Sequence, residues 1–173
     1  MGDPTMASFQ LRQLAAADAE AFRELRLAGL ANAPTAFGAS PAQEAAVPID
    51  TLRARLDASP NAVFGAFVEG RLVGVAGFFR HEGEKHRHRG VLWGVYVDPA
   101  SRGGGIARRL VEAVIDHASR HVLILEAAVS VGNEHAGSLY RALGFEAYGH
   151  HVAALMVEGE LIDEKLLRLD FRR

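Results

Sequence analysis

Apolar residues alternate or cluster over strand-length stretches in several parts of the chain. Such stretches occupy residues 9–14, 62–68, 72–79, 91–97 and 122–129, and residues 145–148, 153–157 and 161–171 supply further strand material. The tight turn Glu69-Gly70-Arg71 joins the second and third stretches, which predicts a β-hairpin. These patterns predict a β-sheet whose strands are distributed along the chain from residue 9 to residue 171.

Between the strands, apolar residues recur at helical spacing. Helices are expected at residues 18–29, with Asp18 as N-cap and Gly29 as the stop, and at residues 49–58, 106–119 and 134–143. Residues 31–48 are rich in Ala, Pro and Ser and predict a long irregular connection with a short helical turn, a kind of segment that is often functional. This order of elements predicts a mixed α/β fold, with residues 1–173 forming a single domain.

Composition narrows the classes of function. The chain has 19 Lys and Arg against 21 Asp and Glu, so it lacks the positive excess of a dedicated nucleic-acid-binding protein. It contains no cysteine, which excludes disulfides and thiol nucleophiles. The apolar runs are too short to cross a membrane, and the N-terminal residues are neither basic nor apolar enough for a signal peptide. We therefore expect a soluble, cytoplasmic protein.

A glycine-rich turn follows one of the expected strands. The strand at residues 91–97 stops at Asp98-Pro99, and Gly103-Gly104-Gly105 then leads into the helix that begins at Ile106. Unpaired amides and the positive end of a helix dipole meet at such a place, which predicts an anion site suited to a pyrophosphate. A Walker A loop is excluded because Gly-Lys-Ser/Thr is absent, and a dinucleotide fingerprint fails because position 108 is Arg. A simple tight turn is the alternative for the glycines alone.

Two motifs give the chain a resemblance to the GCN5-related N-acetyltransferase superfamily. Residues 102–107, Arg-Gly-Gly-Gly-Ile-Ala, match the family's Arg/Gln-x-x-Gly-x-Gly/Ala. Residues 133–140, Asn-Glu-His-Ala-Gly-Ser-Leu-Tyr, followed by Gly144-Phe145, match its Asn-x-x-Ala-x-x-Leu-Tyr and Gly-Phe. The motifs occur in the family's order and lie within residues 91–149. The resemblance implies a central mixed, mostly antiparallel sheet of about seven strands that is splayed in the middle, with helices on both faces.

The resemblance also implies acetyl-CoA or coenzyme A as co-substrate, with no metal. The amides from Gly103 to Arg108 would hold the pyrophosphate, the strand before the loop would hold the pantetheine arm, and one strand N–H would bind the thioester oxygen. Asn133 would contact the arm, and Tyr140 would act as general acid toward the departing thiolate. The cofactor-binding residues expected on this basis are Val95, Tyr96, Val97, Arg102, Gly103, Gly104, Gly105, Ile106, Ala107, Arg108, Asn133 and Tyr140. The alternatives are an ordinary central strand, solvated arginines, an N-cap asparagine and a half-buried tyrosine.

The general base is not assigned by the pattern. Some family members carry Glu five residues before the motif Asn, where this chain has Ala128, and the strand at residues 91–97 has no carboxylate. Glu126 is a candidate base that would act through a water, with a structural or coenzyme-flanking role as the alternative. A water chain or an already neutral amine would also suffice. Glu44, in the irregular connection that walls the acceptor site in this family, is a candidate substrate contact.

These observations predict direct transfer of an acetyl group to a primary amine in a ternary complex. The alternatives are a non-catalytic acyl-CoA-binding or regulatory module and a nucleotide-binding protein. His81 and His86 have the wrong spacing for a zinc-protease helix, so no metal site is expected. The acceptor stays open between a small-molecule amine and a peptide or protein amine, with no nucleic acid or membrane partner. Family members often dimerise, so a homodimer is compatible with the resemblance.

Overall fold

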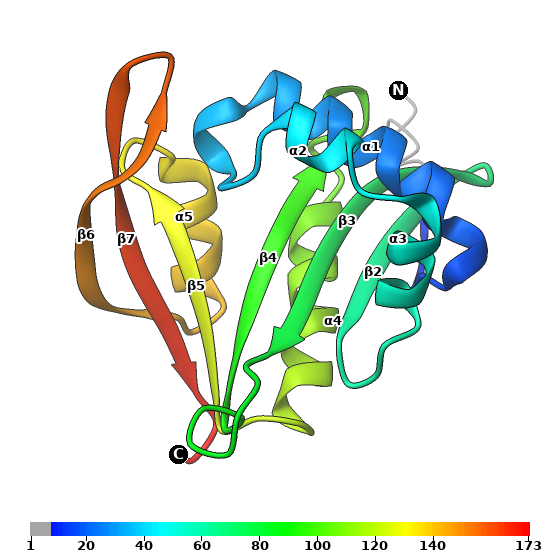
Figure 1. The fold of residues 1–173 in the computed structure, drawn as a ribbon. Helices are drawn as coiled ribbons and strands as arrows, with labels where there is room; N and C mark the ends of the chain where they lie inside the picture. Colours follow the sequence, from blue (N-terminus) through cyan, green and yellow to red (C-terminus); the bar gives the residue numbers. More distant parts are fainter. Residues whose placement is uncertain (1–7) are drawn as a thin grey trace, which may run out of the picture.

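A seven-stranded sheet forms the centre of the structure, a computed structural model that describes residues 8–173 (Figure 1). The strand order is β1-β2-β3-β4-β5-β7-β6, and every neighbouring pair is antiparallel except β4 and β5. The N-terminal residues 1–7, which include the segment tested for a signal peptide, lie outside the described residues. The strands are β1 (Gln10–Gln13), β2 (Ala62–Val68), β3 (Arg71–Arg80), β4 (Arg89–Val97), β5 (Ile124–Ser130), β6 (Glu146–Val157) and β7 (Glu160–Asp170).

Helices cover both faces of the sheet. On one face lie α1 (Ala19–Asn32), α2 (Pro41–Ala45) and α3 (Ile49–Leu56), and on the other lie α4 (Ile106–Ser119) and α5 (Glu134–Ala142) (Figure 1). Two buried apolar clusters correspond to these layers: one includes Phe22 and Leu52 from α1 and α3, and the other includes Leu110 and Tyr140 from α4 and α5. The expected mixed α/β fold is confirmed. Within residues 8–173, no helix has the length and apolar character needed to cross a membrane.

The sheet is splayed between its two parallel strands. β4 and β5 pair only at Arg89↔Ile124, Gly90↔Leu125 and Val91↔Glu126, after which the strands diverge (Figure 1). The helix α5 follows β5 on the α4 side of the sheet, beside the widening gap. The splayed centre that the resemblance implied is therefore present.

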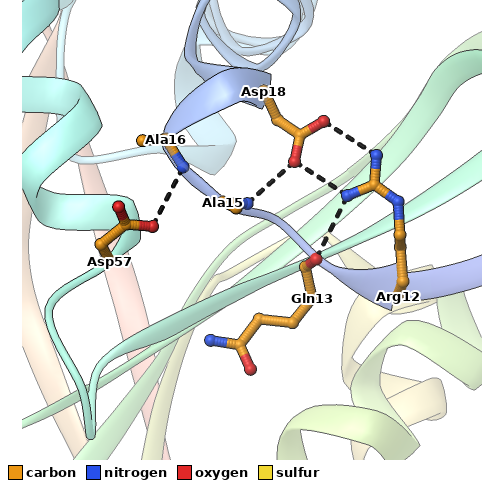
Figure 2. Close-up of polar contacts among 6 residues, drawn as sticks. All are labelled: Arg12, Gln13, Ala15, Ala16, Asp18 and Asp57. Carbon is orange, nitrogen blue, oxygen red and sulfur yellow. Dashed lines mark hydrogen bonds and ion pairs between the residues drawn. The ribbon is translucent and has the colours of Figure 1, made fainter.

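Asp18 occupies the N-cap position of α1, as predicted, but its side chain makes no capping hydrogen bond to that helix. Asp18 directly precedes α1, but its carboxylate accepts a hydrogen bond from the Ala15 N–H at 2.8 Å, so it closes the short 3-10 turn Ala16–Asp18 (Figure 2). Both carboxylate oxygens also bind the Arg12 guanidinium, at 2.8 and 2.9 Å. The Ala16 N–H donates to Asp57 at 3.0 Å, so this turn ties β1 to the end of α3.

Gly29 does not end α1, which continues to Asn32. The glycine faces Tyr96 of β4, and a Cβ at this position would lie 2.9 Å from Tyr96 Cγ. The sequence signal that resembled a helix stop therefore reflects the close approach of a helix to an aromatic ring.

The stretches at residues 145–148 and 153–157 form one strand instead of two. β6 runs through both, with a register shift between His151 and Leu155, and Ala153 has a φ of 51°. Asp163 of β7 supports this irregularity, because it accepts hydrogen bonds from the Ala153 N–H and from His150, both at 2.8 Å.

Candidate active site

The divergence of β4 and β5 opens a cleft of about 390 Å³. One wall is the β4 segment 92–97, and the opposite wall is formed by residues 128–130 of β5 together with α5. Beyond Val91 the β4 edge that faces β5 has no partner strand within residues 8–173, so its backbone N–H and C=O groups are open to a ligand that lies alongside it. Val95, Tyr96 and Val97, the residues expected to bind the pantetheine arm, all line this cleft.

A β-bulge interrupts β4 in the middle of this wall. Trp93 is opposite Gly77 and Tyr96 is opposite Val75, so Gly94 and Val95 together face the single residue Ala76. Gly94 has a φ of 66°, a left-handed conformation that glycine adopts without strain. A bulge leaves a backbone group unpaired and redirects the strand. This bulge was not predicted from the sequence, although an isolated glycine inside a strand is a signal for it.

The side chain of Tyr96 is committed to packing. It is 6% exposed, its ring lies against Gly29, and its hydroxyl is 3.1 Å from Asn32 Nδ2. Phe37, from the connection before α2, packs against it edge to face with ring centroids 6.3 Å apart. Only the Tyr96 backbone is therefore available to a ligand.

The glycine loop forms a second hollow of about 400 Å³ that continues from the cleft. Val97, Arg102 and Leu139 line both spaces, so the two form one groove. Gly103 and Gly105 have φ values of 90° and 78°, and nothing lies within 4 Å of where their Cβ atoms would be. Backbone amides at this loop are therefore open to a ligand without side-chain obstruction.

The start of α4 supplies the unpaired amides. Gly105 is the N-cap, and its carbonyl accepts a hydrogen bond from the Arg109 N–H at 3.1 Å. The amides of Ile106, Ala107 and Arg108 precede that bond and have no acceptor within the helix. Together with the helix dipole they form an anion site at the end of the groove.

The arginines near the loop have different contacts. The Arg102 side chain donates from Nε to the Val97 carbonyl at 3.0 Å and so ties the end of β4 to the loop. Arg108 donates to Glu112 at 3.0 Å, and Arg109 lies 3.8 Å from the same carboxylate. Both side chains are more than half exposed, at 53% and 66%, which agrees with the alternative of solvated helix residues.

Asn133 and Tyr140 both line the cleft from α5. Asn133 is the N-cap of α5 and accepts a hydrogen bond from the Ala136 N–H at 3.3 Å. Tyr140 is 7% exposed, and this burial raises the pKa of its phenol to about 12. Among residues 8–173 the Tyr140 hydroxyl forms no hydrogen bond, so its proton is available to a ligand in the cleft.

The structure does not bring Glu126 into the lining of the cleft. Glu126 lies where β4 and β5 separate, and its carboxylate is 2.6 Å from Arg89 Nη1 and 3.0 Å from His81 Nε2. Burial raises the pKa of this carboxyl, but the hydrogen bonds from Arg89 and His81 outweigh burial and leave the pKa below its ordinary value. These contacts favour the structural alternative, in which Glu126 fastens the β3–β4 connection to β5.

Glu44 lies in a separate hollow of about 300 Å³. Its carboxylate is 3.3 Å from Arg26 Nε, and both side chains are only 12% exposed. Trp93 lines both this hollow and the cleft, so the two spaces adjoin at that residue. Arg26 and Trp93 were not predicted as site residues, because nothing in the local sequence pattern links α1 to the middle of β4.

Residues 27–145 match the family described as the Acetyltransferase (GNAT) family. The chain belongs to this family. It is 41% identical over 99 residues to the N-alpha-acetyltransferase RimI of Mycobacterium tuberculosis, a match that covers 53% of this chain and 57% of that protein. It is 39% identical over 97 residues to the uncharacterized protein ML0378 of Mycobacterium leprae, a match that covers 53% of this chain and 24% of that protein. The chain thus spans less than two thirds of the length of either relative.

Solved structures share the whole fold of this GNAT chain. The structure of yncA from Salmonella typhimurium with its cofactor acetyl-CoA has a TM-score of 0.84 at 22% identity, covering 96% of this chain and 95% of that one. The ribosomal-protein-alanine N-acetyltransferase of Brucella melitensis has a TM-score of 0.80 at 26% identity, covering 93% and 99%. The similarity therefore extends beyond residues 27–145 to both ends of the described fold.

Proposed function

We propose that the protein is an acetyl-CoA-dependent N-acetyltransferase that acetylates a primary α-amine. The observation that carries this proposal is the continuous groove from the amides at the start of α4, along the unpaired edge of β4, to the Tyr140 hydroxyl. Family membership and the N-alpha-acetyltransferase relative support acetyl transfer to such an amine.

The residues present fit a coenzyme A molecule. The open backbone at Gly103 and Gly105 leaves room for a pyrophosphate beside the first amides of α4, where a Cβ would meet nothing within 4 Å. The unpaired edge of β4 offers alternating donors and acceptors to the amide groups of a pantetheine arm. The bulge at Gly94 and Val95 would then present an N–H to the thioester oxygen.

Acetyl-CoA supplies an activated acetyl group: the amine nitrogen bonds to the carbonyl carbon, the carbon–sulfur bond breaks, and one proton passes from the nitrogen to the sulfur. The β4 bulge holds the carbonyl oxygen by hydrogen bonding. Tyr140 donates its phenolic hydrogen toward the sulfur as charge develops there. Ordering both reactants in one cleft makes direct transfer in a ternary complex the expected route.

The acceptor's proton leaves without an assigned protein base. The cleft lining within the described residues contains no Asp or Glu. Glu126 is two residues from Ala128 on the same face of β5, but Arg89 and His81 occupy its oxygens. We propose that the acceptor binds as the neutral amine or passes its proton to water.

The same observation favours a second candidate, a non-catalytic acyl-CoA-binding module. A cleft without a carboxylate would bind the coenzyme equally well without turning it over. Such a module would be stabilised by acetyl-CoA but would release no thiol when amines are added.

The deciding experiment is thermal unfolding with acetyl-CoA, coenzyme A, ATP or NAD, followed by thiol release with a panel of amines. A ligand at about 100 times its Kd stabilises the folded state by about 2.7 kcal/mol, or roughly 5–10 °C in Tm. Stabilisation by acetyl-CoA and coenzyme A, with amine-dependent thiol release, is the expected result. A shift only with ATP or NAD would overturn the assignment of the groove, and binding without thiol release would favour the module.

A further inference from the structure

The hollow that contains Glu44 adjoins the proposed reaction cleft and has a different character. Its volume of about 300 Å³ suits a small molecule and not a polymer. Its walls come from α1, α2, α3, β2, β3 and Trp93 of β4. The apolar residues that line it include Phe22, Leu52, Leu56, Val63, Phe78 and Phe79.

The ion pair of Arg26 and Glu44 lies at the boundary between this hollow and the cleft. The Arg26 guanidinium is 5.1 Å from the Trp93 ring centroid and 5.9 Å from that of Phe37. Its Nη1 is 3.3 Å from where a Cβ on Gly94 would lie, so the positive charge rests against the β4 bulge. The pair therefore lies beside the place where the proposed transfer occurs.

Most of the N–H donors of Arg26 are not used by Glu44. A guanidinium carries five N–H donors, and here the contact with Glu44 is made through Nε. Within residues 8–173 its side chain makes no hydrogen bond of good geometry. Its nitrogens are not among the buried donors that lack a partner, so they are accessible to solvent or to a ligand. An anionic oxygen ligand matches their charge.

We propose that the acceptor is a free α-amino acid with an apolar side chain, an inference that rests on the proposed function. Arg26 binds the carboxylate, for which its planar fork is suited. Glu44 attracts the amino group, and the apolar hollow holds the side chain. The opposite charges of Arg26 and Glu44 thus complement the carboxylate and ammonium groups of the amino acid. The ammonium group then passes its proton to water, and the nitrogen lies where it can reach the bulge.

A protein N-terminus lacks the feature that this site recognises. Its α-amine is followed by a neutral peptide bond, which cannot form a charge-assisted pair with Arg26. The α-amine is common to both acceptor classes, and the adjacent carboxylate separates them.

The test compares leucine, leucinamide and a leucyl peptide as acceptors. We expect kcat/KM to favour leucine over leucinamide by roughly ten- to a hundredfold, the range for a hydrogen-bonded charged group. Arg26→Gln combined with Glu44→Gln removes the pair without leaving one charge buried, and it should reduce that preference to less than about threefold. Leucinamide turnover in the same variant reports whether it is folded and can transfer acetyl groups.

A binding measurement complements the kinetics. In the presence of coenzyme A, leucine should raise the Tm of the parent protein and leave that of the double variant unchanged. Arg53→Gln removes an equal charge from α3, where Arg53 pairs with Asp50 and Glu20, and should keep the preference for leucine. Arg55 is another arginine that lines this hollow. The assignment to Arg26 would be overturned if Arg55→Gln lost the preference for leucine while the double variant kept it.

The outcomes separate the two proposals. Equal or better use of leucinamide or the leucyl peptide overturns the amino-acid inference and leaves the acetyltransferase proposal intact. Stabilisation by leucine with coenzyme A but no transfer to any amine overturns the proposed function and supports the binding site.

Discussion

Replacing Tyr140 by phenylalanine removes one oxygen from the cleft and little else. The ring packs against Phe145 with centroids 5.6 Å apart, and phenylalanine preserves that contact. Because the hydroxyl has no hydrogen-bond partner among residues 8–173, the free energy of unfolding should change by less than about 0.5 kcal/mol. Any larger effect on turnover then belongs to the chemistry.

The magnitude follows from the pKa of about 12 that burial gives the Tyr140 phenol. A thiol has a pKa of about 8.5, so full proton transfer from this phenol to a thiolate is uphill by roughly 5 kcal/mol. The phenol should instead stabilise the transition state by a hydrogen bond to the developing charge on sulfur, which contributes about 1.5–3 kcal/mol. We therefore expect Tyr140→Phe to lower kcat by about 10- to 150-fold. The phenol stays protonated throughout an assay at pH 6–10, so the parent profile should show no alkaline limb from Tyr140.

Release of the coenzyme A thiol can be measured with a thiol reagent. The protein itself contributes no background signal, because the chain contains no cysteine. Tyr148→Phe is the matched control, since Tyr148 lies on β6, is 47% exposed and does not line the cleft. An unchanged kcat in Tyr140→Phe would refute a role for the hydroxyl. A loss greater than about 10⁴-fold would refute the hydrogen-bond reasoning in favour of full proton transfer.

Two further changes test the ends of the groove. In Glu126→Gln we expect a loss of about 1–3 kcal/mol in unfolding free energy at pH 7, with an unchanged pH profile of kcat. Because the folded pKa of Glu126 is lowered, its contribution is present above the ordinary carboxyl pKa of 4.5 and disappears as the pH falls toward the folded value, so the two unfolding curves should converge there. Loss of an acidic limb in the kcat profile would instead identify Glu126 as a base. Gly105→Ala should lower the free energy of unfolding by about 1–2 kcal/mol, because Gly105 has a φ of 78°. The loss should be seen as a lower Tm, and calorimetry should show weaker binding of coenzyme A. Gly104→Ala, with no positive φ and open space at its Cβ position, should change neither, and equal effects in both variants would argue against the conformational explanation.

The sequence predicted most of the architecture because its signals are local. The hairpin of β2 and β3, the apolar stripe of α4 and the Asn133 cap of α5 each depend on residues within a few positions of one another. The glycine loop and the two motifs of the groove were found for the same reason. The sheet order and the splay were available only through the family resemblance.

The errors arose where distant residues decide a local outcome. Gly29 resembles a helix stop, but Tyr96, 67 positions later in the chain, requires a residue without a side chain there. Asp18 is the N-cap residue of α1 as predicted, but its carboxylate binds Arg12 and the Ala15 amide instead of the first amides of that helix. The juxtaposition of Arg26 with the β4 bulge has the same origin, since it depends on how α1 lies across the sheet.

The short contact between β4 and β5 also has a mechanical consequence. Only three register pairs join the β1–β4 half of the sheet to the β5–β7–β6 half within the sheet itself, and the contacts of Glu126 with Arg89 and His81 reinforce that junction. The junction therefore joins the two halves of the sheet at the narrow end of the groove. A molecule lying along the free edge of β4 would connect the two halves at the wide end of the groove, where strand pairing does not join them. Hydrogen exchange of the amides in β5 should consequently slow when coenzyme A binds, even at residues that do not contact it.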